Sequence, residues 1–310
     1  MNKYLLTVFL IIGISPEVFA RDFNHTQVPA KSQLYMHFDA DAFKRSQLGK
    51  FILDHVGKEA EKIDAFALLT QFDPRKDLHG ITVSGVVVGN EPLGTVLVTG
   101  NYKKPQLIAL LQTSSTVKKE QVGGVEILTL SNEIEGEQDN NQSFGSFFDK
   151  NHILLSNDRK ELLNAIKVLA KKAPSLKVNR LKKDAAEKGD YYFSGFLQMK
   201  GITVPPEANF MENVVTVETS VGENKNNFLV SLQMVTANEE AADQLQLIMQ
   251  GFVALAHLSL INNEEPGVKE AKEILGKINF TAKKNIVFIN LSYPMGKTLE
   301  WLRLQLAEDQ

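Results

Sequence analysis

The stretch Val214–Phe252, VVTVETSVGENKNNFLVSLQMVTANEEAADQLQLIMQGF, decides how this chain folds. Apolar and polar residues alternate in 214–221 and again in 228–235, and this period of two predicts a β-hairpin. The period then changes to 3.6, which predicts an amphipathic helix, and Thr236 and Glu239 stand before it at the spacing of a capping box. The apolar stripe of this helix contains Leu245, Ile248, Met249 and Phe252.

The same order of two strands, a polar capping residue and a helix recurs three more times, in Gly80–Gln112, Ser143–Leu169 and Ile278–Leu306. The copies share the pattern and not the sequence, so the repetition is architectural. A hairpin followed by a helix buries one face of an antiparallel sheet under that helix. The pattern therefore predicts an α+β protein with two tandem domains, each a mainly antiparallel sheet of hairpins packed against helices.

The length of 310 residues fits two domains, at ~150 residues for each domain. We expect a flexible lead at 21–32, a first α+β domain at 33–173, a basic linker at 174–189 and a second α+β domain at 190–310. The linker is broken by Pro174 and is poor in large apolar residues. Strand 34–38 opens the first domain, and the helix after it is expected to carry Phe43, Leu48, Phe51, Ile52 and Val56.

Residues 1–20 have the layout of a signal peptide, with Lys3, the apolar run Leu5–Ile14 and the small-residue sequence Val18-Phe19-Ala20. We expect cleavage after Ala20 and a periplasmic or secreted protein. A membrane anchor is the alternative, but the run is about half the length of a spanning helix. No later segment reaches ~18 uncharged apolar residues, so we expect no transmembrane segment after cleavage.

The composition excludes several classes of function. The chain has no Cys, which excludes disulfides, thiol catalysis, cysteine zinc sites and a lipid anchor on cysteine. Its 34 basic and 37 acidic residues give a net charge of −3, so no overall field attracts nucleic acid or an anionic membrane. Hydrophobic residues make up 43% and charged residues 23%, the composition of a globular protein with a sizeable core.

His37, Asp39 and Asp41 are the candidate metal ligands. They occupy positions i, i+2 and i+4, which an extended strand places on one face. In the alternative interpretation, Asp39 or Asp41 caps the following helix and His37 lies on the solvent face of the strand. We identify no catalytic residue, and the sequence predicts no cofactor.

Two other motifs are incomplete. Gly296-Lys297-Thr298 follows a strand as in a phosphate-binding loop, but that motif requires Gly where Leu291 stands. Ser115 and Lys118 have the spacing of a penicillin-recognising site, but the supporting Ser-Asp-Asn and Lys-Thr-Gly triplets are absent.

The sequence does not decide whether two charged segments contact a partner. The acidic loop 131–142 lacks the ordered acid spacing of a calcium loop, which favours a solvated loop. The basic segment 167–183 has no interleaved aromatic residues for base stacking or membrane insertion, which favours a solvated helix and linker.

The helix at 239–261 is the most apolar of the mature chain. Apolar residues surround much of its circumference near the C-terminal end, which indicates burial on more than one side. We expect this helix to form the core, against the sheet or the other domain. The alternative is a subunit interface, which would make the protein a homo-oligomer.

The arrangement resembles a group of uncharacterised exported bacterial two-domain α+β proteins. The resemblance rests on the signal, the strand Leu34–Phe38 leading into a helix, the Asp73-Pro74-Arg75 turn before a hairpin and the second start near Tyr191. The resemblance implies a two-domain α+β fold and export from the cell. The group has no established active site whose residues could be identified in this chain. We therefore expect an exported non-enzymatic binding or assembly protein with a protein or cell-envelope partner. The alternative is a periplasmic or secreted hydrolase with an unrecognised active site.

Overall fold

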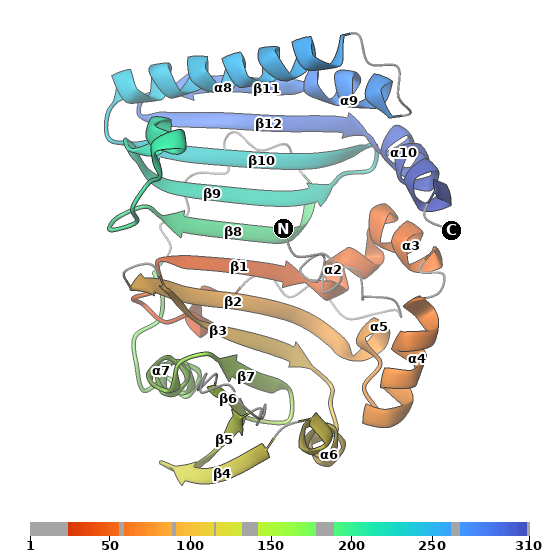
Figure 1. Ribbon diagram of the computed structural model, residues 1–310, viewed down its shortest axis with the longest axis vertical. Helices are drawn as coiled ribbons and strands as arrows, with labels where there is room; N and C mark the ends of the chain where they lie inside the picture. Colours follow the sequence, from red (N-terminus) through yellow and green to blue (C-terminus); the bar gives the residue numbers. More distant parts are fainter. Residues whose placement is uncertain are drawn as a thin grey trace, which may run out of the picture. The chain divides into compact units, whose positions relative to one another are not determined.

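The computed structural model describes residues 24–55, 59–88, 91–114, 116–131, 142–177, 189–261 and 267–308. The expected signal peptide, Ser115, residues 132–141 of the acidic loop and residues 178–188 of the basic linker lie outside these ranges. The chain divides into two compact units, 1–178 and 179–310 (Figure 1). The division falls inside the segment 174–189.

The first unit contains an antiparallel sheet in the order β1-β2-β3-β7-β6-β5-β4. Its described strands are β1 (Leu34–Asp39), β2 (Leu78–Val88), β3 (Glu91–Gly100), β4 (Thr116–Val122), β5 (Val125–Ser131), β6 (Gln142–Phe147) and β7 (His152–Ser156). Its described helices are η2 (His25–Gln27), α2 (Ala40–Arg45), α3 (Gln47–Asp54), α4 (Glu59–Thr70), α5 (Pro74–Asp77), α6 (Lys104–Ser114) and α7 (Arg159–Leu169).

The second unit contains an antiparallel sheet in the order β8-β9-β10-β12-β11. Its described strands are β8 (Asp190–Gln198), β9 (Val214–Glu223), β10 (Asn227–Thr236), β11 (Ile278–Lys283) and β12 (Ile286–Pro294). Its described helices are η4 (Pro206–Met211), α8 (Glu239–Leu260), α9 (Val268–Leu275) and α10 (Met295–Glu308).

The predicted fold class is confirmed: both units are α+β, with antiparallel sheets and helices (Figure 1). The four predicted copies of the hairpin and helix appear as β2–β3–α6, β6–β7–α7, β9–β10–α8 and β11–β12–α10. Among the described residues, no helix combines the length and the hydropathy that crossing a bilayer requires.

Each unit has a core between its sheet and one of these helices. In the first unit α7 packs on β3, β5 and β7, and the buried residues are Leu97, Ile127, Leu154, Leu162, Ala165 and Ile166. In the second unit the N-terminal part of α8 packs on β9, β10 and β12, with buried Val214, Met234, Ala242, Leu245 and Val287. In these cores the apolar face of the sheet, predicted by the period of two, packs against the apolar face of the helix, predicted by the period of 3.6.

The helix after β1 is two helices, where the sequence predicted one. Ser46 interrupts it, because its hydroxyl donates to the carbonyl oxygen of Phe43 at 2.7 Å and accepts the backbone N–H of Gly49 at 2.8 Å. A Cβ atom on Gly49 would lie 1.8 Å from the Phe43 carbonyl oxygen, so only glycine fits this close approach.

The cap of α8 also differs from the prediction. Asn238 accepts the backbone N–H of Ala241 at 2.8 Å and begins the helix. The hydroxyl of Thr236 instead donates to the carbonyl oxygen of Asn238, at 2.8 Å. The N-cap therefore lies two residues after the one that the capping-box spacing predicted.

Residues 24–32, the described part of the predicted flexible lead, pair with residues 174–177. Val28 is buried, and its carbonyl oxygen accepts the backbone N–H of Leu176 at 2.8 Å. The backbone N–H of Ala30 donates to the Pro174 carbonyl oxygen at 3.1 Å, and residues 29 and 175 form a β-bridge. We call the paired segments 24–32 and 174–177 the strap.

Candidate functional site

Helix α8 presents a continuous apolar surface on its outer side. Leu247, Leu255 and Leu258 are 67%, 62% and 61% exposed, and Ile261 is 58% exposed. We call this surface the apolar stripe, and it consists of Leu247, Ile248, Gly251, Phe252, Ala254, Leu255, Leu258 and Ile261. The prediction that this helix packs in the core against the sheet is confirmed for its N-terminal part, where Ala242 and Leu245 are buried. All residues of α8 after Leu245 are exposed or half-buried.

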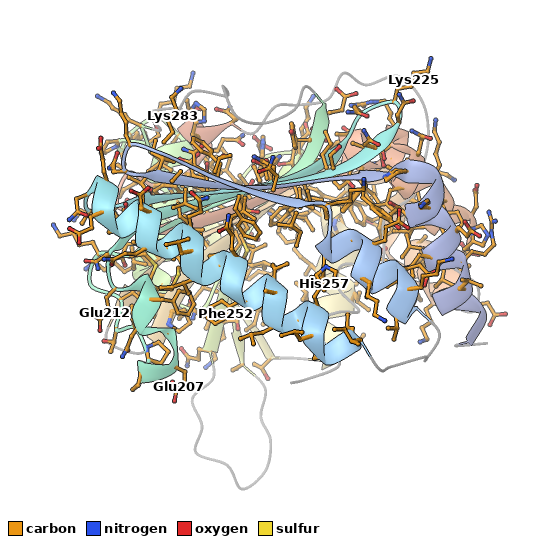
Figure 2. All side chains as sticks on the ribbon, turned by 90° about the horizontal axis from the view of Figure 1, so that it is seen from above. Glu207, Glu212, Lys225, Phe252, His257 and Lys283 are labelled. Atoms are coloured by element: carbon orange, nitrogen blue, oxygen red, sulfur yellow. The ribbon has the colours of Figure 1, made fainter. Side chains whose placement is uncertain are left out.

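The stripe has one aromatic neighbour in the same unit. The ring of Phe252 meets the ring of Phe210 from η4 edge to face, with centroids 5.3 Å apart. Figure 2 shows Phe252 near the η4 segment labelled at Glu207 and Glu212. Phe252 still remains 46% exposed, so η4 covers only part of the stripe.

The charged residues of α8 lie near its N-terminal end. Three acidic residues lie in the first turns of α8, Glu239, Glu240 and Asp243, and the helix contains neither Lys nor Arg. At the other end, Nζ of Lys272 of α9 lies 3.4 Å from the carbonyl oxygen of Ile261, and α9 carries two Glu beside its two Lys. The acids are favourable at the helix N-terminus because of the helix dipole.

A cavity in the first unit, which contains polar side chains in a mainly apolar lining, is the second candidate. It has a volume of about 590 Å³ and lies between the turn joining β6 to β7, the end of α7 and the strap. In it the Nδ1 atom of His152 lies 2.8 Å from Oδ2 of Asp149, and Nε2 lies 3.4 Å from the amide nitrogen of Gln27. The hydroxyl of Tyr102 donates to the backbone carbonyl oxygens of Asp149 and His152.

Hydrogen bonds keep Asp149, which forms a dyad with His152, in the carboxylate form. Burial by itself raises the pKa of Asp149, but N–H groups of Asn151 and His152 together with the His152 ring hold it below its usual value. Burial, with a contribution from the Asp149 carboxylate, raises the pKa of Tyr102 to about 12. Asp149 is therefore a carboxylate that orients the His152 ring.

An aspartate–histidine dyad has the chemistry of a general base, but nucleophilic catalysis also needs a hydroxyl or thiol within hydrogen-bond reach. Thr26 and Ser175 line the cavity, yet among the described residues no hydroxyl hydrogen-bonds to the His152 ring. Sequence reasoning missed this dyad. The signal was the Asp-x-x-His spacing in a turn between two predicted strands.

The three candidate metal ligands occupy separate environments. The Nδ1 atom of His37 lies 2.9 Å from the hydroxyl of Thr82, and burial lowers the pKa of His37 to about 4. Asp39 caps α2 by accepting the backbone N–H of Ala42 at 2.8 Å, as in the alternative interpretation. Burial raises the pKa of Asp39 although this hydrogen bond opposes the effect.

Asp41, the third candidate, lies inside a buried ion pair. Its carboxylate accepts from Nζ of Lys44 at 3.2 Å and lies 2.9 Å from Nδ1 of His79. Asn101 Nδ2 lies 3.0 Å from the other nitrogen of the His79 ring. Within the described ranges, no group of three or more His, Asp or Glu side chains is arranged to hold a metal ion.

Two remaining features of the sequence, Lys297 and the basic segment 167–183, fall in different places. Lys297 pairs with Glu273 of α9, and the strand before it is antiparallel, unlike the parallel strands that precede phosphate-binding loops. Lys167 lines a second cavity of about 780 Å³ beside α7, and Lys171 and Lys177 line the cavity of the dyad.

Comparisons with known proteins identify the fold and no family. No family model matches the chain, and no curated protein matches it. Crystal form III of TP0453 is similar in structure, with a TM-score of 0.50 and 10% identity over 92% of this chain and 98% of that one. Crystal form I of TP0453 has a TM-score of 0.46 and 10% identity, over 91% of this chain and 97% of that one. At this identity the likeness to crystal form III shows a shared α+β fold alone.

Proposed function

We propose that this chain is an exported, non-enzymatic binding or assembly protein, and that the apolar stripe of α8 is its association surface. The observation that carries the proposal is the exposure of the stripe. Large contiguous apolar patches are rare on monomeric soluble proteins, and they mark interaction sites. The partner in this proposal is a protein of the cell envelope.

A protein partner is favoured over an anionic membrane surface. Helices that lie on such membranes carry Lys and Arg on their polar face. The exposed polar positions of α8 carry acidic and amide side chains, such as Asp243 and Gln250. Electrostatics therefore opposes binding of α8 to anionic lipid.

The test compares Leu255→Asp with a matched control, Leu304→Asp. Both leucines are exposed on helices of the second unit, at 62% and 53%, but only Leu255 belongs to the stripe. We expect both variants to keep the circular dichroism spectrum of the parent, because neither aspartate is buried. In envelope extracts the parent and Leu304→Asp should run in a complex larger than the monomer, and Leu255→Asp should not. Equal sizes for the parent and Leu255→Asp would refute the assignment.

Export is proposed from the N-terminal sequence, and intact-mass measurement tests it. Protein isolated from the cell envelope should begin at Arg21. A retained leader would contradict cleavage.

A hydrolase is the second candidate, and the dyad of Asp149 and His152 beside a cavity favours it. A hydrolytic activity that is lost in His152→Ala and kept in Leu255→Asp would assign the function to this cavity. Conversely, a cavity without such activity agrees with a non-enzymatic protein.

A further inference from the structure

We propose that the partner of the apolar stripe is a second copy of this chain, and that the two copies pair through antiparallel α8 helices. The inference rests on the proposed function and identifies the partner.

The stripe has the spacing of a coiled-coil seam. Along its centre the residues are Leu247, Gly251, Ala254, Leu258 and Ile261, separated by four, three, four and three positions. This alternation has the mean period of 3.5 residues that keeps a helix seam facing a partner helix. A helix that only covers a sheet has no need of such a seam on its outer side.

The central part of the seam, from Leu247 to Leu258, is complementary to itself in the antiparallel orientation. When two copies are aligned about the midpoint between Phe252 and Val253, Leu247 lies opposite the partner's Leu258. Gly251 then lies opposite the partner's Ala254. Each contact occurs twice, as a two-fold axis requires, so two leucine layers flank a central crossing made of small residues.

Gly251 is explained by this crossing and not by the fold of the single chain. A Cβ atom on Gly251 would meet nothing within 4 Å, and the residue lies in the interior of a 22-residue helix, where glycine is unfavourable. Small residues on two facing helices allow their axes to approach to about 8 Å. The glycine therefore serves a close contact with another helix.

Charge favours the antiparallel orientation over the parallel one. The acidic first turns of the two copies, with Glu239 and Glu240, lie at opposite ends of an antiparallel pair. A parallel pair would instead place acid against acid, which opposes it.

The exposed area is sufficient for a specific dimer. The six large side chains of the stripe leave on the order of 600 Å² exposed on each copy, more than single scattered apolar residues. Pairing two copies would cover at most about 1,200 Å², compared with the ~1,000 Å² that a specific interface needs.

The first test measures the mass of purified mature protein by light scattering coupled to size exclusion. At about 100 µM the parent should be a dimer, because a dimer with micromolar Kd is then almost fully formed. Gly251→Leu should shift the protein to monomer by separating the helices. Gly296→Leu is the matched control, since it also fills open space at an exposed helix glycine, and it should leave the dimer intact.

The second test determines the relative orientation of the two α8 helices by disulfide cross-linking. The chain has no native Cys, so only the introduced cysteines can form a disulfide. Oxidising a mixture of Leu247→Cys and Leu258→Cys chains should give a disulfide-linked dimer, and either variant alone should give little. Strong cross-linking of Leu247→Cys with itself would indicate parallel helices and overturn the proposal.

The outcomes separate this inference from the proposed function. A purified parent that is monomeric, but forms a larger complex in envelope extracts that Leu255→Asp abolishes, overturns self-pairing and leaves the association surface in place. A protein that is monomeric both when purified and in envelope extracts overturns self-pairing and the association surface together. A purified monomer that binds phosphatidylglycerol vesicles through the stripe would assign the stripe to lipid and also overturn self-pairing.

Discussion

Replacing His37 with Gln should remove much of the acid sensitivity of the first unit. Burial lowers the pKa of His37 from 6.5 to about 4 in the folded protein. Between these values the unfolded chain binds more protons at this position than the folded chain, so stability increases with pH in this window. The contribution of His37 to the unfolding free energy is fully present above pH 6.5 and is lost as the pH falls towards 4.

The magnitude follows from the difference between the two pKa values of His37. At 1.36 kcal/mol per pKa unit, the whole difference corresponds to about 3 kcal/mol of unfolding free energy. The part lost between pH 7 and pH 5 is about 2 kcal/mol. Other groups also titrate in this range, and comparing the parent with the variant cancels their contributions.

The assay is urea denaturation of the parent and His37→Gln at pH 7, 6 and 5. The unfolding free energy of the parent should fall by about 2 kcal/mol more than that of the variant. Thr82→Val is the control, because it removes the hydrogen bond at 2.9 Å and keeps the buried ring, so it should retain the pH dependence of the parent. Parallel pH dependence of the parent and His37→Gln would refute the reasoning.

Three further variants test single features of the first unit by urea denaturation at pH 7. Asp41→Asn should destabilise the protein by about 3 kcal/mol, because it leaves the buried Lys44 ammonium without its carboxylate; a loss below 1 kcal/mol contradicts this. Gly49→Ala should cost several kcal/mol, since its methyl group meets the carbonyl oxygen of Phe43, and unchanged stability would show that the backbone adapts. Asp158→Ala should cost about 1 kcal/mol through loss of the α7 cap, and no change would mean that water replaces the cap.

Periodicity predicted the fold because it is local. The alternation in β9 and β10 and the 3.6 period in α8 are properties of neighbouring residues, and the antiparallel hairpin follows from them. The capping residue was misplaced by two positions, because Thr236 and Asn238 both have side chains that cap helices.

The candidate sites were less predictable, because they depend on which elements pack together. The metal hypothesis assumed an extended chain through Asp41, but α2 begins at Ala40 and turns that side chain towards Lys44 and His79. For the end of α8, composition gives the number of apolar residues but not which of them the sheet covers. The sheet buries Leu245 and leaves Leu255 outside.

The strap brings the first and last described segments of the first unit together, with residues 29 and 175 in one β-bridge. Chain ends that meet in this way can be joined by a short linker, and new ends can be opened at an exposed turn. The turn at Gly123-Gly124, between β4 and β5, is such a place, since both glycines have open space around them. A circularly permuted first unit that starts at Gly124 therefore keeps every strand pairing of its sheet, including that of β4 with β5. It loses only the turn that connects these two strands.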